Sequence, residues 1–361
     1  MHPLKRLLVE SGYLRFYLAF GDGNRRTMAW RMHKSKLGEP AQTLVRLFLL
    51  KEWVDTAGVR RILGSALFSQ LSQVGVLAEK DGATHANGFL LISFHSILVF
   101  FQRLADPSVY FGGDSVALAL YQTRVPEGVT LDLCAGSGIQ PMLAALHARQ
   151  SIGVEINPLA ARVATFNCAL NGLENKVTIV NQPLEQYGRK GRQRFDLVTF
   201  NPPLLPMPRD TKYPFVGHGG DDGLDVTRTI MKLYLPRLTP TGGMEFIGCG
   251  LGRSGDYQFA KELERTCRPL KAGGYVQIMG TGKLEEDCPM YDSLVVTIMG
   301  HNPWSLKECY ERCARHWEKL GVDEMYMFVA RLDRQPAHRG TVKVLDLSGS
   351  TPDWIVRSKD Y

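Results

Sequence analysis

A buried strand in the middle of the chain ends in two rigid hydrogen-bond acceptors. The β-branched run Phe195–Phe200 predicts a strand, and Asn201-Pro202-Pro203-Leu204 follows it. The prolines fix φ and donate no hydrogen bond, so they stiffen the turn. The side-chain oxygen of Asn201 can therefore accept a hydrogen bond from a substrate N–H, and the backbone carbonyl of Pro202 can accept another from the same nitrogen. Two such acceptors orient a nitrogen lone pair and stabilise positive charge growing on it, as methyl transfer to a planar, weakly nucleophilic nitrogen requires.

A second candidate site combines a glycine loop with an acid. The first predicted strand of the central region runs into Asp132-Leu133-Cys134-Ala135-Gly136-Ser137-Gly138, and Glu155 ends the next strand, 17 positions after the last of these glycines. Glycines let a backbone approach a ligand closely, and an acid at that strand end can hold both hydroxyls of a ribose. The pattern fits a dinucleotide or S-adenosylmethionine. A dinucleotide loop is disfavoured because position 141 is Pro, where its fingerprint has Gly.

These side chains need a scaffold that brings strand ends together, and the sequence between residues 106 and 300 predicts one. Short apolar runs alternate with helical stretches there. The expected strands are Val129–Leu133, Ser151–Glu155, Val177–Val180, Phe195–Phe200 and Met244–Cys249. The expected helices are Gln140–Arg149, Pro158–Leu170, Asp225–Leu238 and Asp256–Cys267. This alternation predicts an α/β fold with a doubly wound, Rossmann-like, mostly parallel sheet, which binds ligands beyond the carboxyl ends of its strands.

The flanking regions predict further parts. Residues 1–37 form a basic N-terminal segment, expected as a helix pair or an arm. Residues 38–105 predict three helices and a hairpin between Val76–Lys80 and Gly88–Ser93, a winged-helix-like domain. Its presumed recognition helix, Ser65–Val74, contains no Lys or Arg, so we do not expect it to read DNA. Residues 301–361 form a C-terminal extension with late strands or a small cap.

Composition excludes several classes of protein. The chain has 361 residues, 44% of them apolar, and a formal net charge of +7, which permits an anionic partner without demanding one. The longest apolar run, Phe89–Phe101, is too short and too polar to span a bilayer, so no membrane association is expected. Seven cysteines without a CxxC pair suit a reducing cytoplasm. Cys309, Cys313 and His316 have no second ligand pair, so no metal is expected.

Four segments of the chain, taken in order, resemble segments of class I S-adenosylmethionine-dependent methyltransferases. The likeness is strongest to the small methyltransferase branch, which includes the protein-glutamine N5 methyltransferases of release factors and N-methyltransferases of ribosomal RNA bases. The matching segments, in chain order, are Val109–Ser115, Asp132–Gly138, Glu155 and Asn201–Pro203, with the glycine-rich turn Gly219–Asp225 after them. The likeness covers roughly residues 106–255.

The resemblance implies a cofactor and a set of site residues. The cofactor is S-adenosyl-L-methionine, and the residues assigned to it are Asp114, Asp132, Gly136, Gly138, Glu155, Ile156, Gln182 and Asn201. The residues assigned to catalysis are Asn201, Pro202, Pro203 and Leu204. Position 204 is usually aromatic in this branch, so the leucine favours a smaller acceptor or stacking by Tyr213 or Phe215. The third strand lacks the usual acid for the adenine amino group, and the side-chain carbonyl of Gln182 or Asn181 can replace it.

The sequence therefore predicts an N-methyltransferase acting on a protein or peptide amide, a nucleobase or a heteroaromatic metabolite. One alternative is a natural-product methyltransferase acting on oxygen or an amine, with His218 as base. Another is a DNA-binding regulator with a ligand-sensing domain, which would have no need of Asn201-Pro202-Pro203. The expected partner is a methyl acceptor that is a peptide, a nucleic acid or a small molecule, and the N-terminal domain is a candidate homodimer interface.

Overall fold

The computed structural model describes residues 1–20, 27–191 and 193–348 and divides into two compact units. Unit 1 comprises Met1–Phe111, Ala135–Leu146 and Ser151–Asn181. Unit 2 comprises Gly112–Cys134, His147–Gln150 and Gln182–Tyr361. Each unit has an apolar core of its own. The boundaries near residues 37, 105 and 300 that the sequence suggests stay a prediction.

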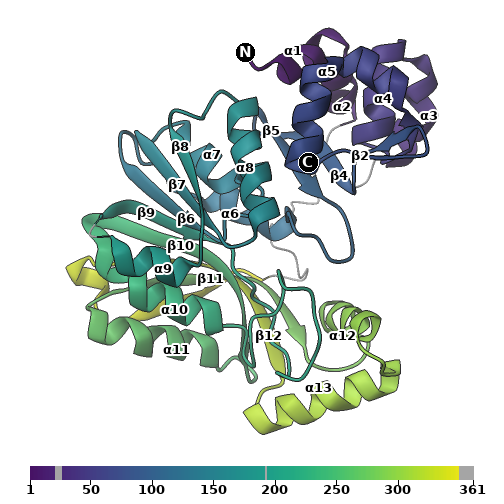
Figure 1. The fold of residues 1–361 in the computed structure, drawn as a ribbon. Helices are drawn as coiled ribbons and strands as arrows, with labels where there is room; N and C mark the ends of the chain where they lie inside the picture. Colours follow the sequence, from purple (N-terminus) through teal and green to yellow (C-terminus); the bar gives the residue numbers. More distant parts are fainter. Residues whose placement is uncertain (21–26, 192, 349–361) are drawn as a thin grey trace. The chain divides into compact units, whose positions relative to one another are not determined.

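Unit 1 begins with a cluster of helices, drawn in purple and blue in Figure 1. They are α1 (Pro3–Glu10), α2 (Tyr13–Ala19), α3 (Thr27–His33), α4 (Glu39–Phe48) and α5 (Thr56–Val74). The Asp55 carboxylate accepts from the Gly58 N–H at 2.7 Å and so caps α5, as its position before the apolar pattern predicts. Gly64, at φ +74°, divides α5 into the two predicted helices. A small sheet with the order β1-β3-β2 packs beside them: β1 (Val54–Asp55), β2 (Ala78–Lys80) and β3 (Ala83–His85).

The predicted hairpin between Val76–Lys80 and Gly88–Ser93 is wrong. Strand β2 pairs with β3, which lies inside the expected loop, while β4 (Phe89–Phe94) pairs with β5 (Ile97–Gln102). Each pair is joined by two residues at positive φ: Asp81 and Gly82 in one turn, His95 and Ser96 in the other. Such turns match the twist of a hairpin. The His-Ser turn lacks the usual Asn-Gly signal, and the sequence reading missed it.

The rest of unit 1 supplies two parallel strands and two helices. Strand β7 (Gln150–Glu155) pairs with β8 (Val177–Asn181), and the helices are α7 (Ile139–Ala145) and α8 (Pro158–Leu170). The side-chain amide of Asn167, on α8, exchanges hydrogen bonds with the backbone N–H and C=O of Phe100 at 3.0 Å. Asn171 does the same at Leu98. Two asparagines thereby satisfy backbone groups of β5 that have no strand partner on that side.

Unit 2 is built on six strands in the order β13-β11-β12-β10-β9-β6. Their bounds are β6 (Val129–Leu133), β9 (Phe195–Phe200), β10 (Leu238–Gly252), β11 (Gly273–Lys283), β12 (Glu324–Asp333) and β13 (Val342–Asp346). The pairs β6/β9, β9/β10 and β11/β13 are parallel, while β12 runs antiparallel to both of its neighbours. With β7/β8 in unit 1, parallel pairing dominates, so the predicted α/β class is confirmed. The C-terminal extension supplies late strands, which are separated by β11 rather than paired with each other.

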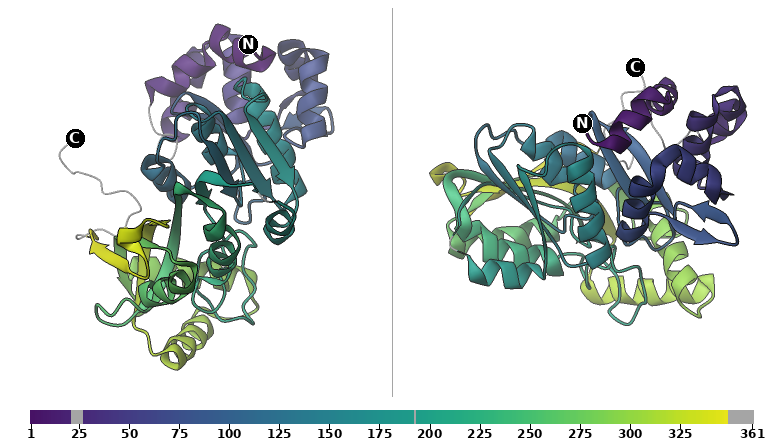
Figure 2. Two further views of the ribbon diagram at one scale, coloured as in Figure 1. Left: turned by 90° about the vertical axis from the view of Figure 1, so that its left-hand side faces the viewer. Right: turned by 45° about the horizontal axis from the view of Figure 1, so that its top comes forward.

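Helices cover this sheet. They are α6 (Gly113–Tyr121), α9 (Leu184–Lys190), α10 (Asp225–Tyr234), α11 (Gln258–Cys267), α12 (Pro289–His301) and α13 (Leu306–Leu320). Short 3₁₀ turns are Lys34–Lys36, Leu235–Arg237, Arg268–Leu270 and Pro336–His338. Helices α9, α10 and α11 lie side by side (Figure 1), and α12 and α13 form a pair, light green in Figure 2. None of the helices within the described ranges is long and apolar enough to cross a membrane.

Candidate active site

Asn201 follows the carboxyl end of β9, where a parallel sheet presents functional side chains. Its side-chain N–H donates to Ser115 Oγ at 3.2 Å, in the first turn of α6. Ser115 Oγ in turn accepts from the backbone N–H of Gly112 at 3.3 Å. This contact fixes the rotation of the Asn201 amide and leaves its oxygen without a hydrogen-bond donor among the described residues. The geometry of unit 2 therefore leaves an acceptor oxygen at the end of β9, and its predicted role toward a substrate stays a prediction.

Two buried acids accompany Asn201 in unit 2. Asp132, at the end of β6, is 3% exposed and accepts from the Thr199 hydroxyl of the neighbouring strand at 2.7 Å. Asp114, in the first turn of α6, is 9% exposed and accepts from the backbone N–H of Ser115 at 2.7 Å. Buried carboxylates need donors to offset desolvation, and these contacts supply part of them.

Glu155 is the acid of unit 1. It ends β7, is 7% exposed, and its two carboxylate oxygens accept from the backbone N–H groups of Gly136 at 2.8 Å and Asn157 at 2.7 Å. Burial raises the pKa of Glu155, while the backbone donors act in the opposite direction. No cation pairs with it in the part of the chain that the structure describes. A buried carboxylate held in one orientation without a counter-ion suits a ligand that brings hydroxyl donors, such as a ribose.

The glycine loop beside Glu155 uses backbone conformations that favour glycine. Gly136 and Gly138 have φ of +52° and +80°, and a Cβ on Gly138 would lie 3.0 Å from the Cβ of Ala164. The carbonyl of Ser137 accepts from the side-chain amide of Asn167 at 2.9 Å. Helix α8 thus supports the loop, which itself donates to Glu155 through the Gly136 N–H. Sequence reasoning missed Asn167, because a mid-helix asparagine carries no motif.

The expected adenine contacts fall at the ends of β7 and β8. The side-chain N–H group of Asn181 donates to the carbonyls of Glu155 at 2.8 Å and Ile156 at 3.0 Å, so this residue holds the turn after β7. Ile156 is 50% exposed and offers an apolar face to a flat ring. Gln182, partly exposed, stays the candidate acceptor for the adenine amino group.

The residue after Asn201-Pro202-Pro203 points into the core. Leu204 is 6% exposed and packs in the apolar cluster that includes Ile247 and Cys249. The glycine-rich turn lies directly against the backbone of Leu204. A Cβ on Gly219 would lie 2.7 Å from the Leu204 carbonyl carbon, and a Cβ on Gly223 would lie 2.6 Å from the Leu204 carbonyl oxygen. Glycine is required at these positions, so that the turn can lie directly against the segment from Asn201 to Leu204.

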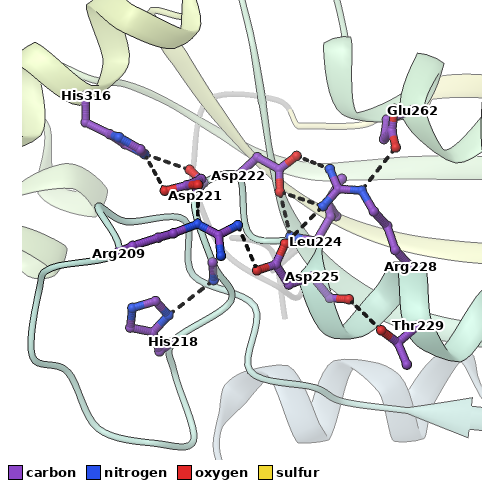
Figure 3. Close-up of polar contacts among 11 residues, drawn as sticks. Arg209, His218, Asp221, Asp222, Leu224, Asp225, Arg228, Thr229, Glu262 and His316 are labelled. Atoms are coloured by element: carbon purple, nitrogen blue, oxygen red, sulfur yellow. Dashed lines mark hydrogen bonds and ion pairs between the residues drawn. The ribbon is translucent and has the colours of Figure 1, made fainter. Parts of the chain in front are cut away.

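An ion-pair network holds this turn in place (Figure 3). Arg228, on α10, binds the carboxylates of Asp222, Asp225 and Glu262, with 3.2 Å to Asp225 and 3.0 Å to Glu262. Figure 3 shows these carboxylates arranged around its guanidinium group.

A second set of contacts holds the same turn from its other side. The guanidinium of Arg209 binds Asp221 at 2.6 Å and Asp225 at 3.5 Å, and His316 of α13 contacts the Asp221 carbonyl at 2.9 Å. Sequence reasoning missed this network. Its signal was the acidic segment 221–225, whose last acid, Asp225, begins α10 and precedes Arg228 by three positions.

The other substrate candidates occupy different environments. Tyr213 packs against Gly217 and lies near His301, with ring centroids 6.2 Å apart, whereas Phe215 is 65% exposed. His218 Nδ1 accepts from the backbone N–H of Gly220 at 3.2 Å. In the neutral ring the proton therefore lies on Nε2, which leaves no free lone pair for a general base.

Cys309 and Cys313 of α13 are buried in the apolar core of unit 2, next to Tyr291 and Trp317. Their pKa values are raised by burial, that of Cys313 to about 12, so both are protonated at neutral pH. The two cysteines therefore behave as small residues of the apolar core.

Comparison with known proteins connects these features to a family. Residues 115–202 match the family model described as ribosomal protein L11 methyltransferase (PrmA). The segment contains Ser115, Asp132, the glycine loop, Glu155 and Asn201-Pro202. The predicted resemblance to S-adenosylmethionine-dependent methyltransferases is thereby confirmed for this part of the chain.

Three relatives illustrate the range of acceptors. The chain is 35% identical over 154 residues to a ribosomal protein uL3 glutamine methyltransferase of Bradyrhizobium diazoefficiens, covering 40% of this chain and 47% of the relative. It is 29% identical to a putative protein N5-glutamine methyltransferase of Methanocaldococcus jannaschii, covering 38% and 70%. It is 26% identical to a tRNA1(Val) (adenine(37)-N6)-methyltransferase of Yersinia pseudotuberculosis, covering 37% and 52%. The chain thus spans about half the length of two of these relatives.

Proposed function

We propose that the protein is an S-adenosylmethionine-dependent N-methyltransferase whose acceptor is a planar nitrogen. The observation that carries this proposal is the fixed amide of Asn201, whose oxygen is left free at the end of β9. The relatives methylate glutamine amides or an adenine amino group by name, and both acceptors present a planar N–H. Protein glutamine and nucleic acid are therefore the two leading acceptor classes, ahead of a heteroaromatic metabolite.

Residues of unit 1 and unit 2 take different parts in this proposal. Glu155 accepts from the ribose hydroxyls of the cofactor, Gly136 and Gly138 allow its close approach, and Ile156 and Gln182 contact the adenine. Asp114 and Asp132 are assigned to the rest of the cofactor. When bound, S-adenosylmethionine supplies an electrophilic methyl group.

Asn201 and Pro202 act on the acceptor. The Asn201 side-chain oxygen and the Pro202 carbonyl accept from the acceptor N–H, which turns the nitrogen lone pair out of conjugation and toward the incoming methyl group. As positive charge grows on the nitrogen, both acceptors stabilise it, and the acidified N–H proton then passes to solvent. Pro203 stiffens this arrangement, and Leu204 anchors it in the core.

The N-terminal elements fit a winged-helix-like module of α4, the two parts of α5 and the sheet β1-β3-β2. We propose that it serves substrate binding. Its use as a homodimer interface, and the cytoplasmic location of the protein, stay predictions.

Replacement of Asn201 tests the proposed function. Asn201→Ala should lower the turnover rate about 10²- to 10³-fold, as the loss of one preorganised group does. Its affinity for S-adenosylhomocysteine, measured by calorimetry, should change little. Turnover is measured with radiolabelled S-adenosylmethionine and three acceptor preparations: purified ribosomes, a translation release factor and unfractionated tRNA. Asn201→Asp keeps an acceptor oxygen and should retain part of the activity.

The oxygen-methylating alternative gives the opposite pattern. If His218 were the base, His218→Ala would abolish turnover while both Asn201 variants stayed active. That result would remove the proposed mechanism.

A further inference from the structure

Positive charge is concentrated at the N-terminal end of the chain. Residues 1–111 contain 14 Lys and Arg against 8 Asp and Glu, which gives +6 of the total +7. Residues 112–361 contain 29 against 28 and are nearly neutral. Such an asymmetry provides an electrostatic footprint for a polyanion on one part of a protein.

The excess of +6 lies in residues 1–50, whereas residues 51–111 contain five Lys and Arg against five Asp and Glu. An exposed aromatic pair lies in this second, neutral segment. Trp53, between α4 and β1, stacks on His85 of β3, with ring centroids 4.8 Å apart and ring planes 25° apart. Trp53 is nevertheless 48% exposed. His85 is held by the backbone N–H of Asn87, which donates to its Nδ1 at 2.9 Å. The indole is therefore a rigid, solvent-facing platform for another flat ring.

Two cations without an ion-pair partner among the described residues, Lys51 and Arg103, lie near each other, and Lys51 also lies near His85. Lys51 Nζ donates to the backbone carbonyl of Arg103 at 2.9 Å, and burial together with the Arg103 charge lowers the pKa of Lys51. The Lys51 charge contributes to lowering the pKa of His85, which places it near the ring pair. Within the described residues neither Lys51 nor Arg103 forms an ion pair. Glu52, the acid next to Lys51, is already bound by Lys34 and Arg46.

We propose that Lys51, Trp53, His85 and Arg103 bind an unpaired segment of nucleic acid. A base stacks on Trp53, and neighbouring phosphates contact Lys51 and Arg103. Stacking platforms beside cations are the usual means of binding single strands without sequence preference. An apolar peptide would gain nothing from two unneutralised cations. This binding does not depend on the proposed methyl transfer. It goes beyond the proposed function by giving the chain a nucleic-acid partner.

The helix Ser65–Val74 agrees with this mode of binding, because its lack of Lys and Arg excludes base reading in a duplex groove. The surface should therefore prefer unpaired strands to duplexes.

Fluorescence anisotropy with the full chain tests the proposal. The probes are a labelled 15-nucleotide RNA of mixed sequence, the DNA of the same sequence, and the corresponding RNA duplex, all without cofactor. Trp53→Ala should weaken single-strand binding about 5- to 100-fold, the range for losing one stacked base, and Trp53→Phe should retain most of the affinity. Lys51→Gln with Arg103→Gln should reduce the slope of log K against log salt by about 1.4, for two lost phosphate contacts on a single strand.

A matched double variant controls for net charge. Arg265→Gln with Lys307→Gln removes the same charge from exposed positions of unit 2 and should leave the salt slope unchanged. Circular dichroism shows whether each variant is folded. If Trp53→Ala does not fold, the affinities of Trp53→Phe and of the Lys51/Arg103 variant still test the proposal. Equal RNA and DNA affinities, or tighter RNA binding through the 2′-hydroxyl, both support the proposal.

Three results would overturn it: no binding to either single strand, tighter binding to the duplex, or equal losses in the control and Lys51/Arg103 variants. Absence of methyl transfer would contradict the proposed function alone and leave this binding unaffected.

Discussion

Replacing Arg228 with methionine should lower the proposed methyltransferase activity by releasing the turn that lies against the segment from Asn201 to Leu204. Arg228 is the shared partner of Asp222, Asp225 and Glu262, and its side chain is 25% exposed. Methionine keeps much of the length and the apolar contacts of the arginine stem but removes the charge. The three carboxylates would then face one another without a counter-ion.

The cost can be worked from these contacts. Partly exposed ion pairs contribute roughly 0.2–1 kcal/mol each, and removal of the shared cation adds repulsion between the remaining acids. We expect a loss of about 2–3 kcal/mol in the stability of unit 2. For a domain of this size that corresponds to a melting temperature lower by roughly 4–12 °C.

The effect on turnover should exceed the effect on stability. Asp222 and Asp225 bracket Gly223, whose backbone touches the Leu204 carbonyl, so their release lets the segment from Asn201 to Leu204 shift. A displacement of about 1 Å can cost about 10²-fold in rate. We therefore expect kcat for Arg228→Met to fall about 10- to 100-fold at a temperature where the protein is fully folded. Affinity for S-adenosylhomocysteine should stay unchanged.

Arg265→Met provides the control. Arg265 also contacts Glu262, at 3.3 Å, but its side chain is 70% exposed and it binds no residue of the turn. Gly223→Ala is a complementary change, because a Cβ there would lie 2.6 Å from the carbonyl oxygens of Leu204 and Cys249 without any loss of charge. It should reproduce the loss of kcat. If Arg228→Met matched Arg265→Met in both melting temperature and kcat, the network would have no positioning role.

The remaining predictions concern unit 1. Glu155→Ala should lose about 2–3 kcal/mol of S-adenosylmethionine affinity by calorimetry, because two charge-assisted hydrogen bonds disappear; unchanged affinity would place the ribose elsewhere. Because burial raises the pKa of Glu155, affinity should be constant above that pKa and fall as the pH drops through it. The decline should begin at higher pH than for an ordinary glutamate of pKa 4.5, and be absent in Glu155→Gln. Asn167→Ala removes the hydrogen-bond partner of buried backbone groups of Phe100 and Ser137. It should lower the stability of unit 1 by about 3–5 kcal/mol, measured by thermal unfolding. Asn171→Ala, whose site is partly exposed, should cost less. Equal losses in these two variants would contradict the assignment.

The central sheet could be predicted because its signals are local. Short β-branched runs alternating with helical periodicity place β6 to β9 and α8 within one or two residues, and α8 matches at both ends. Strand β11 and helix α12 were not predicted. Residues 273–283 contain glycines at 273, 274, 280 and 282, which weaken a strand signal, yet backbone pairing with β12 on one side and β13 on the other forms it.

The candidate site residues also divide into those with a local sequence signal and those without one. Asn201, Glu155 and the glycine loop each belong to a short local motif, so sequence alone indicates them. The residues that orient them come from distant segments: Ser115 fixes the Asn201 amide across 86 positions, and Asn167 holds Ser137 across 30. Single serines and asparagines carry no signal until tertiary contacts give them partners. The motifs proposed to carry the chemistry could therefore be found in the sequence, while the residues that orient them could not.

The leucine at position 204 follows from those supports. With the glycine turn against its backbone and its side chain in the core beside Ile247 and Cys249, residue 204 cannot present a ring to an acceptor. An aromatic residue there would have to displace core side chains, at a cost of about 1–3 kcal/mol for overpacking. Stacking on the acceptor must then come from elsewhere in the loop, and Phe215, 65% exposed, is a ring of the loop that is free to supply it. A flat nucleobase acceptor would require that ring, whereas a glutamine amide held by Asn201 and Pro202 would need little of it. Whether Phe215 matters to catalysis therefore separates the two acceptor classes that the site admits.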